Sequence, residues 1–409
     1  MSPINRSAGG PSDRLIIFAG IAIAIIIFGP RSTFGLFVGP MTAARGWGVE
    51  QFALAIAIQQ LTWGALQPLG GALADRFGAW KTVAMGAVFY AVGMLMMIFA
   101  PTTGLLHLSA GVFVGAGLAG GGLPIVVAAV GQLVSEQKRS FALGLVTAGS
   151  SLGQFAFAPL GQLFIDQYGW QLALLLLAIP LITLPILALP FRAAKNQQTE
   201  ESSSTGLGAA LKHAFLHPSY QLLVAGFFVC GFHVSFITVH LPPYFAELGI
   251  DAGYAALALS LIGLFNVFGA VGSGILGQRF SKRYLLSLLY SLRAIVITVF
   301  LLSDKSLNDV LIFSAALGLL WLSTVPLTSG LVATMFGTRH LGSLFGVVFF
   351  SHQIGAFIGI WLGGYLYEHQ GSYNTTWFVA VLLSVAAALI HLPIREQAVP
   401  MRASSAPSA

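Results

Sequence analysis

Charged residues are scarce in this chain. Asp, Glu, Lys and Arg make up 8% of its 409 residues, whereas a soluble domain carries roughly 25%. The hydrophobic share is 56%, more than a water-soluble core could hide, so we expect lipid to be the surrounding solvent. The formal net charge of +6 is therefore not read as a sign of nucleic-acid binding, and the distribution of the charge along the chain matters more.

Groups that carry catalysis are also few. The single cysteine, Cys230, excludes an intrachain disulfide. The run "GAGLAG", Gly115 to Gly120, has the spacing of a dinucleotide-binding loop, but that loop must follow a strand in a βαβ unit. Here it lies inside a long apolar run, which favours close helix packing. The sequence shows no metal-ligand cluster and no nucleophile motif, so we expect no enzyme, no cofactor and no metal site.

Long apolar runs separated by short polar breaks fill most of the chain instead. Each run is long enough to cross roughly 30 Å of hydrocarbon as a helix. The sequence thus predicts an all-α membrane protein with twelve transmembrane helices. The runs cover residues 15–42, 50–74, 81–100, 105–134, 140–166, 170–191, 219–246, 253–277, 284–302, 308–336, 341–367 and 373–392.

The basic residues orient these helices. Lys and Arg gather near both termini and in the breaks on the same side; Arg45 and Lys305 lie on the opposite side, and Arg31 and Arg293 lie inside helices. Positive residues mark the cytoplasmic side, so we expect both termini there. We expect a flexible linker and a disordered tail from Val399. The predicted parts are a segment 1–14, a six-helix half 15–191, a linker 192–218, a second half 219–392 and a tail 393–409.

The two halves repeat each other. "GALADRF" at Gly71 to Phe77 matches "GILGQRF" at Gly274 to Phe280, each following the second helix of its half. The same spacing relates Pro40 to Pro243. Two pseudo-symmetric halves of six helices are the plan of one large class of secondary transporters.

The repeated loop also carries a family resemblance. "GGALADRFGAWK" resembles the loop signature of the major facilitator superfamily, and "GSGILGQRFSKR" resembles its second-half echo. The resemblance implies the major facilitator fold and a transporter that works by alternating access. It also implies a charge cluster that holds one state of the cycle. The loop motif comprises Gly71, Asp75, Arg76, Gly78 and Lys81.

A narrower resemblance begins in the first helix. "GPRSTFGLF" is similar to the monocarboxylate transporters, which place a basic residue after proline in a like segment, and the bacterial oxalate/formate-type branch is similar in general pattern. In monocarboxylate transporters the eighth helix carries an acid and, four residues on, an arginine. Those positions correspond here to Asn266 and Ala270. The missing charges point away from lactate-like substrates and from the usual proton relay.

Arg31 is a bare cation near the middle of the first predicted helix. No Asp or Glu lies between Asp13 and Glu50, and a central arginine costs roughly 2.5–3.5 kcal/mol on insertion scales. Because no acid lies well inside any apolar run, we expect a substrate carboxylate to be the partner. The alternative is that Arg31 binds backbone carbonyls or snorkels outward. Arg293 lies in the ninth helix, which the superfamily places at the periphery, and we expect a structural role for it.

Histidines are the remaining groups inside the helices that titrate near neutral pH. His233, His240 and His352 are therefore candidates for binding a coupling proton; the alternative for each is a neutral ring bonded to a neighbouring helix. Polar residues on the helices that line the cavity in the family complete the candidate set, and for several the alternative is helix–helix contact. The candidate substrate-binding residues are Arg31, Gln59, Trp63, Gln154, His233, Asn266, Trp321, His352 and Gln353.

The leading hypothesis is a secondary active transporter that moves a small organic anion, a monocarboxylate, by proton symport. Proton and anion moving together would be nearly electroneutral, which suits one cation and no buried acids. The alternative is proton-antiport export of drugs or other amphiphiles, although Gly111 stands where such exporters carry an arginine and the fifth helix reads "GQFAFAPLGQ". A sensor would need an output domain that the sequence lacks. We expect a monomer in the lipid of a bacterial inner membrane.

Overall fold

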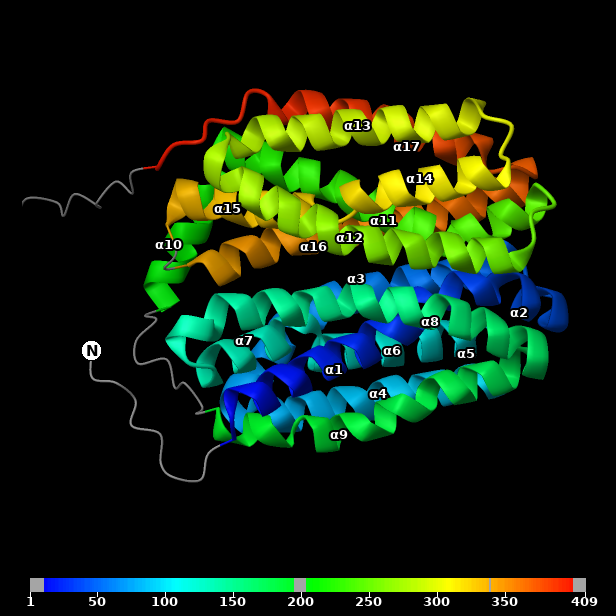
Figure 1. Ribbon diagram of the computed structural model, residues 1–409, viewed down its shortest axis with the longest axis horizontal. Coiled ribbons are helices and arrows are strands. Elements are labelled where there is room, and N and C mark those ends of the chain that lie inside the picture. Colours follow the sequence, from blue (N-terminus) through cyan, green and yellow to red (C-terminus); the bar gives the residue numbers. More distant parts are fainter. Residues whose placement is uncertain (1–10, 195–203, 338–339, 400–409) are drawn as a thin grey trace, which may run out of the picture.

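The computed structural model describes residues 11–194, 204–337 and 340–399. Within these ranges every regular element is a helix. The long helices run side by side and end at two opposite faces (Figure 1). We call the face where α1 begins and α10 lies the linker face, and the opposite one the far face.

The first half contains α1 to α9. Its first passage is α1 continued by η1 and α2, and its fourth passage is broken into α5, η2, α6 and α7. The bounds are α1 Asp13–Ser32, η1 Phe34–Phe37, α2 Val38–Arg45, α3 Val49–Phe77, α4 Ala79–Phe99, α5 Thr103–Leu106, η2 His107–Phe113, α6 Val114–Gly121, α7 Leu123–Leu133, α8 Glu136–Ala178, η3 Ile179–Thr183, α9 Leu184–Leu187 and η4 Leu189–Ala193.

The second half contains α11 to α17, preceded by the linker helix α10. Its fourth passage is again broken, into α14 and α15. The bounds are α10 Ser204–Phe215, α11 Pro218–Glu247, α12 Ala252–Arg279, α13 Lys282–Leu302, α14 Leu307–Leu320, α15 Thr324–Phe336, α16 Leu341–Gln370 and α17 Asn374–His391.

Each predicted apolar run is a helical passage. Ten segments of the described residues are long and apolar enough to cross a membrane. One of them, Glu136–Ala193, holds two passages, because the chain turns back at Gly169, whose φ of 74° is not helical (Figure 1). α3, which carries Gln59, Gln60 and Gln67, is a further long helix outside that set. The prediction of an all-α protein with twelve passages is confirmed.

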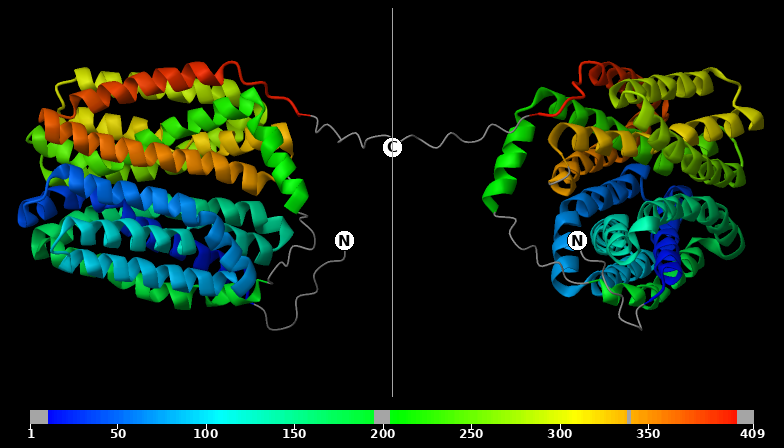
Figure 2. Two further views of the ribbon diagram at one scale, coloured as in Figure 1. Left: turned by 180° about the vertical axis from the view of Figure 1, so that it is seen from behind. Right: turned by 60° about the vertical axis from the view of Figure 1, so that its left-hand side comes forward.

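The hydrophobic core is divided in the same way. One cluster of buried side chains comes from the first half, with only Val239 and Ile360 from the second. The other comes from the second half, with only Leu36 and Ala158 from the first. The two groups of helices lie one above the other in Figures 1 and 2. Each half therefore packs around its own core, as the internal repeat predicts.

Large apolar side chains cover the outside of both halves. Phe18, Phe99, Ile182, Leu302 and Ile312 are each more than 60% exposed. Exposed apolar surface on this scale is unfavourable in water but matches a hydrocarbon surrounding. The outer surface therefore agrees with the composition in assigning lipid as the solvent.

The linker and the C-terminal end differ from the flexible segments predicted. Residues 195–203 lie outside the described ranges, but most of the remaining linker, Ser204–Phe215, forms α10. The tail was predicted from Val399, and residues 400–409 lie outside the described ranges. Val399 itself donates its backbone N–H to the carbonyl oxygen of Met335 at 2.8 Å, and Ile394 is fully buried.

Glu396 ties this C-terminal segment to the loop before α13. Its carboxylate accepts hydrogen bonds from Lys282 Nζ at 2.9 Å, from the Lys282 backbone N–H at 2.9 Å and from Ser281 Oγ at 2.7 Å. Burial alone would raise the pKa of Glu396, but the hydrogen bonds from Lys282 and Ser281 outweigh it and hold that pKa below its ordinary value. The carboxylate is therefore favoured in the folded protein.

Replacing Glu396 by glutamine is expected to lower the free energy of unfolding by about 0.2–1 kcal/mol, the range of partly exposed ion pairs. Because the folded-state pKa is lowered, the wild-type advantage is present above the ordinary glutamate pKa of about 4.3 and is lost as the pH falls through the folded-state value. Thermal unfolding at pH 7 and pH 4 measures it. Glu247→Gln, at an exposed helix end, is the control and should show no such loss.

Candidate functional site

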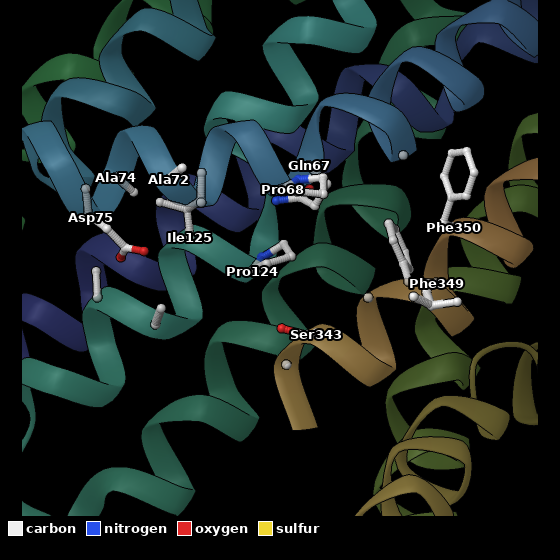
Figure 3. Close-up of a pocket in the computed structure, with 18 of the residues that line it drawn as sticks. Gln67, Pro68, Ala72, Ala74, Asp75, Pro124, Ile125, Ser343, Phe349 and Phe350 are labelled. Atoms are coloured by element: carbon white, nitrogen blue, oxygen red, sulfur yellow. The ribbon is translucent and has the colours of Figure 1, made fainter. Parts of the chain in front are cut away.

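A cavity of about 1030 Å³ lies between the halves and reaches the linker face. Its walls come from α3, α7, α10 and the beginning of α16, and Figure 3 shows Pro68 and Gln67 from α3 and Pro124 from α7 pointing into it. Most of the lining is apolar. Among the described lining residues Asp75 is the one that carries a charge, and it lies toward the linker face.

An aromatic layer forms the inner end of the cavity. Phe349 of α16 lines the cavity, and its ring meets Trp63 edge to face with centroids 5.5 Å apart. On its other side Trp63 contacts Phe28 of α1 at 5.9 Å. Trp63 is only 6% exposed, and its Nε1 donates to Gln67 Oε1 at 2.9 Å. This layer separates the open cavity from the group behind it.

Arg31 is that group. It follows Pro30 in the last turn of α1, where the helix gives way to η1. Its guanidinium carbon lies 5.0 Å from the centroid of the Trp63 ring, a cation–π contact, and Nη2 donates to Gln60 Oε1 at 3.0 Å. Nε is buried without a hydrogen-bond partner. In the described part of the chain no carboxylate pairs with Arg31.

A hydrogen-bonded chain leads from Arg31 into the second half. Gln353 Nε2 of α16 donates to the backbone oxygen of Gln60 in α3 at 3.1 Å. Gln353 Oε1 lies 3.1 Å from His352 Nδ1. Gly64 permits this approach, because a Cβ there would lie 2.8 Å from the Gln353 side chain. The predicted residues Arg31, Trp63, His352 and Gln353 are thus brought together at the boundary of the two halves.

The other polar candidates lie in contacts between helices. Gln59 Nε2 donates to Ala110 O at 2.9 Å inside the first half, and Gln154 Nε2 donates to Leu259 O at 2.9 Å across the halves. Asn266 Nδ2 donates to Ser151 Oγ at 2.8 Å, while its Oδ1 accepts from the backbone N–H of Leu322 at 2.9 Å. None of these candidates is among the described lining residues of the cavity.

Trp321 and Arg293 meet at the break between α14 and α15. Trp321 is 2% exposed and ends α14. The fully buried Arg293 donates from Nη2 to the backbone oxygens of Leu320 and Trp321. Carbonyls that the broken helix leaves without partners are thereby satisfied. This is the geometry expected of a structural arginine.

Tyr90 was not singled out from the sequence, yet it lies next to Arg31. It comes from α4, is 1% exposed and faces both the side chain and the backbone of Arg31. Phe28 and Phe349 were missed in the same way. A tyrosine or phenylalanine in an apolar run gives no signal of its own, so only the helix packing shows that these rings surround the arginine.

The loop motif lies where the cavity opens. Gly78 ends α3 with a φ of 94°, a conformation that glycine adopts without strain. Asp75 lines the cavity, while Lys81 lies over the ring of Trp80, which Arg192 also covers at 4.1 Å. No ion pair joins Asp75 to Lys81 in the described residues. The charge cluster expected to hold one state is therefore not assembled between these two residues on the open side.

The far face is closed by contacts between the halves. Glu368 of α16 accepts a hydrogen bond from the backbone N–H of Glu50, at the beginning of α3, at 2.9 Å. Trp361 Nε1 donates to Glu50 Oε1 at 3.3 Å. A Cβ at Gly35 would overlap the backbone oxygen of Thr238. The central cavity is therefore open at the linker face and closed toward the far face.

Comparison with known families assigns this architecture. The family model described as Major Facilitator Superfamily matches residues 20–306 and, in a second match, residues 246–408. The chain belongs to the major facilitator superfamily. This family and its fold are those of membrane transporters, not of enzymes.

Relatives of this transporter include named and uncharacterised proteins. It is 29% identical over 389 residues to monocarboxylate transporter 13 of Rattus norvegicus, covering 93% of this chain and 88% of that protein. It is 24% identical over 378 residues to the uncharacterised MFS-type transporter YcxA of Bacillus subtilis, covering 88% of this chain and 90% of the other. The resemblance to the monocarboxylate transporter branch is confirmed.

The fold of the transporter matches solved structures. A bacterial homologue of the human lysosomal transporter Spinster, in an inward-facing and occupied conformation, aligns with a TM-score of 0.75 and 13% identity. The match covers 94% of this chain and 97% of that chain. At this identity the likeness establishes the fold alone, and it agrees with the two-half arrangement described above.

Proposed function

We propose that this transporter moves a small organic anion, a monocarboxylate, by proton symport. The observation that carries the proposal is Arg31, a partly buried cation of the first half that lies behind Trp63, has no carboxylate partner in the described residues and has a buried Nε without a hydrogen-bond partner. A buried charge is strongly destabilising without a partner, and a substrate carboxylate would supply one through charge-assisted hydrogen bonds. The substrate would thereby satisfy a group that the protein leaves unsatisfied.

The chemistry of the cavity fits a carboxylate with an apolar body. Apolar walls and the rings of Phe349 and Phe350 would contact the body, while one cation would favour one carboxylate over two. The names of the relatives, monocarboxylate transporters, support the same substrate class. The absence of the acid and arginine at Asn266 and Ala270 argues that the proton is carried elsewhere in this chain, on a histidine.

The transport cycle we propose is alternating access between the two halves. The linker face would be cytoplasmic, because the basic residues gather there, and the protein would work as a monomer in a bacterial inner membrane. The structure would then correspond to the state open to the cytoplasm. Transport would require the far-face contacts of Glu50 and Glu368 and the Gln353–Gln60 hydrogen bond behind the cavity to separate, and the linker-face opening to close.

Ligand-induced thermal stabilisation of the purified protein tests the substrate class. We expect benzoate and acetate to raise the melting temperature, and the matched amides benzamide and acetamide to have no effect. A ligand at 100 times its dissociation constant adds about 2.7 kcal/mol to stability, so the shift is measurable. Equal stabilisation by acid and amide would contradict recognition of the carboxylate.

A second candidate function is export of amphiphilic compounds. The cavity volume of about 1030 Å³, its apolar walls and the position of Asp75 at its open side are the observations that favour it. Stabilisation by lipophilic cations and not by carboxylates would support this function over the first. Arg31 would then have no role in binding.

A further inference from the structure

The three candidate histidines differ in their surroundings. His233 Nε2 lies 2.7 Å from the backbone oxygen of Ala380, and the residue is completely buried inside the second half. His240 is 1% exposed, and its ring nitrogens lie 2.8 Å from Ile360 O and 3.2 Å from Tyr373 Oη. Both rings therefore bond to neighbouring helices of the second half and lie away from the cavity lining.

His352 alone among them contacts the cavity wall. Its ring stacks on that of Phe349, with centroids 5.9 Å apart and planes 7° from parallel. It is 8% exposed and lies next to Gln353, which bonds across the boundary to Gln60. We propose that His352 binds the coupled proton, and that the hydrogen-bonded chain His352–Gln353–Gln60–Arg31 links this proton to the bound anion. This inference rests on the proposed function.

The hydrogen bonds define which nitrogen would take the proton. Gln353 Nε2 donates to Gln60 O, which leaves Gln353 Oε1 as an acceptor. His352 Nδ1 must therefore carry the hydrogen of the 3.1 Å contact with Oε1. The proton would be taken up on the lone pair of Nε2, forming imidazolium, and released unchanged on the other side. No other bond forms or breaks.

The charges around His352 predict whether a bound anion would raise or lower the affinity of this residue for the proton. On α11 the Cys230 thiol lies beside the imidazole, and Arg293 of α13 lies behind Cys230. Phe227 and Phe349 cover the ring with apolar surface. No carboxylate pairs with His352 in the described residues, and Arg31 is the cation at the other end of the chain. When the site is empty, imidazolium would therefore face the Cys230 thiol, apolar rings and the two cations, with no carboxylate among the described residues.

An anion at Arg31 would remove this penalty. A carboxylate there would neutralise one cation and attract the other, so the anion would raise the affinity for the proton. By thermodynamic reciprocity, protonation would raise the affinity for the anion by the same factor, typically 5- to 150-fold. The Gln353–Gln60 hydrogen bond joins α16 to α3. Separation of the halves would therefore break the connection between His352 and Arg31.

The dissociation constant of benzoate, measured by calorimetry between pH 5.5 and 8.5, tests this proposal. In the wild type the affinity for benzoate should increase 5- to 150-fold as the pH falls from 8.5 to 5.5. His352→Gln should bind benzoate with a constant that is independent of pH. The matched controls His233→Gln and His240→Gln should keep the wild-type pH dependence.

Proton uptake gives a second measurement that needs no variant. Adding benzoate to the wild-type protein in weakly buffered solution should raise the pH of the solution, because each bound anion brings a proton with it. A wild-type pH dependence retained in His352→Gln, or anion binding without proton uptake, would overturn the assignment while leaving the Arg31 site standing. If neither benzoate nor acetate binds the wild type at any pH, the proposed function itself fails.

Discussion

Replacing Arg31 by glutamine is expected to remove carboxylate binding and to leave the empty protein at least as stable as the wild type. Truncating one partner of a buried charge pair costs about 2–5 kcal/mol of binding free energy, which corresponds to roughly 30-fold to several thousandfold in the dissociation constant. In the absence of substrate, however, the variant loses a partly buried cation that has no anionic partner in the described residues. The two effects have opposite signs.

Loss of carboxylate binding without loss of stability in the empty protein would distinguish a binding role of Arg31 from a structural one. Thermal unfolding with and without benzoate measures both effects in a single experiment. Arg293→Gln is the matched control, because Arg293 bonds the backbone oxygens of Leu320 and Trp321. It should lower the stability of the empty protein and leave the response to benzoate in place. If Arg31→Gln behaves like Arg293→Gln, Arg31 holds the structure together and does not bind the substrate.

Replacing Gly35 by valine is expected to prevent closure of the far face and to abolish transport. The backbone of η1 passes so close to α11 that a Cβ at Gly35 would overlap the carbonyl oxygens of Thr238 and Val239. These atoms belong to the other half, so the halves can separate to relieve the overlap without unfolding either core. We therefore expect a folded protein that stays open at the far face.

Maleimide labelling measures this opening. The buried Ile360 lies among the side chains of the first core, so a cysteine in Ile360→Cys, with Cys230→Ser to remove the native thiol, reports on access from the far face. Labelling should be several times faster when Gly35→Val is added. Gly39→Val is the control, because a Cβ at Gly39 has no atom within 4 Å. Unchanged labelling together with normal transport would show that the Gly35 contact does not control closure.

The sequence predicts the fold well because hydrocarbon imposes a simple rule. A helix that crosses lipid must be long and apolar, so the apolar runs predict the twelve passages. The fourth passage of each half is predicted as one run, and its break is seen only in the structure. The short polar break between the runs 140–166 and 170–191 predicts the turn at Gly169, where the backbone leaves the helical conformation. The linker helix α10 was not predicted, because its surroundings of glycine, serine and polar residues are typical of a flexible segment.

The site is harder to predict because composition does not say which way a side chain points. Gln59 and Gln60 are adjacent on α3, yet one bonds Ala110 inside the first half and the other bonds Arg31. Arg31 could be found because a lone charge in an apolar run is unusual. Tyr90 and Phe349 could not, because aromatic residues are ordinary in such runs and acquire a role only through their neighbours.

The separation of the two cores has a consequence for the energy of the transport cycle. Few buried side chains of one half belong to the core of the other, and hydrogen bonds such as Glu50 to Glu368 and Gln353 to Gln60 also join the halves. Each such bond contributes about 0.5–1.5 kcal/mol net, and about 5.5 kcal/mol is enough to reverse populations from 1:99 to 99:1. A bound anion and a bound proton would therefore reverse the populations if together they bind one state more tightly than the other by about 5.5 kcal/mol.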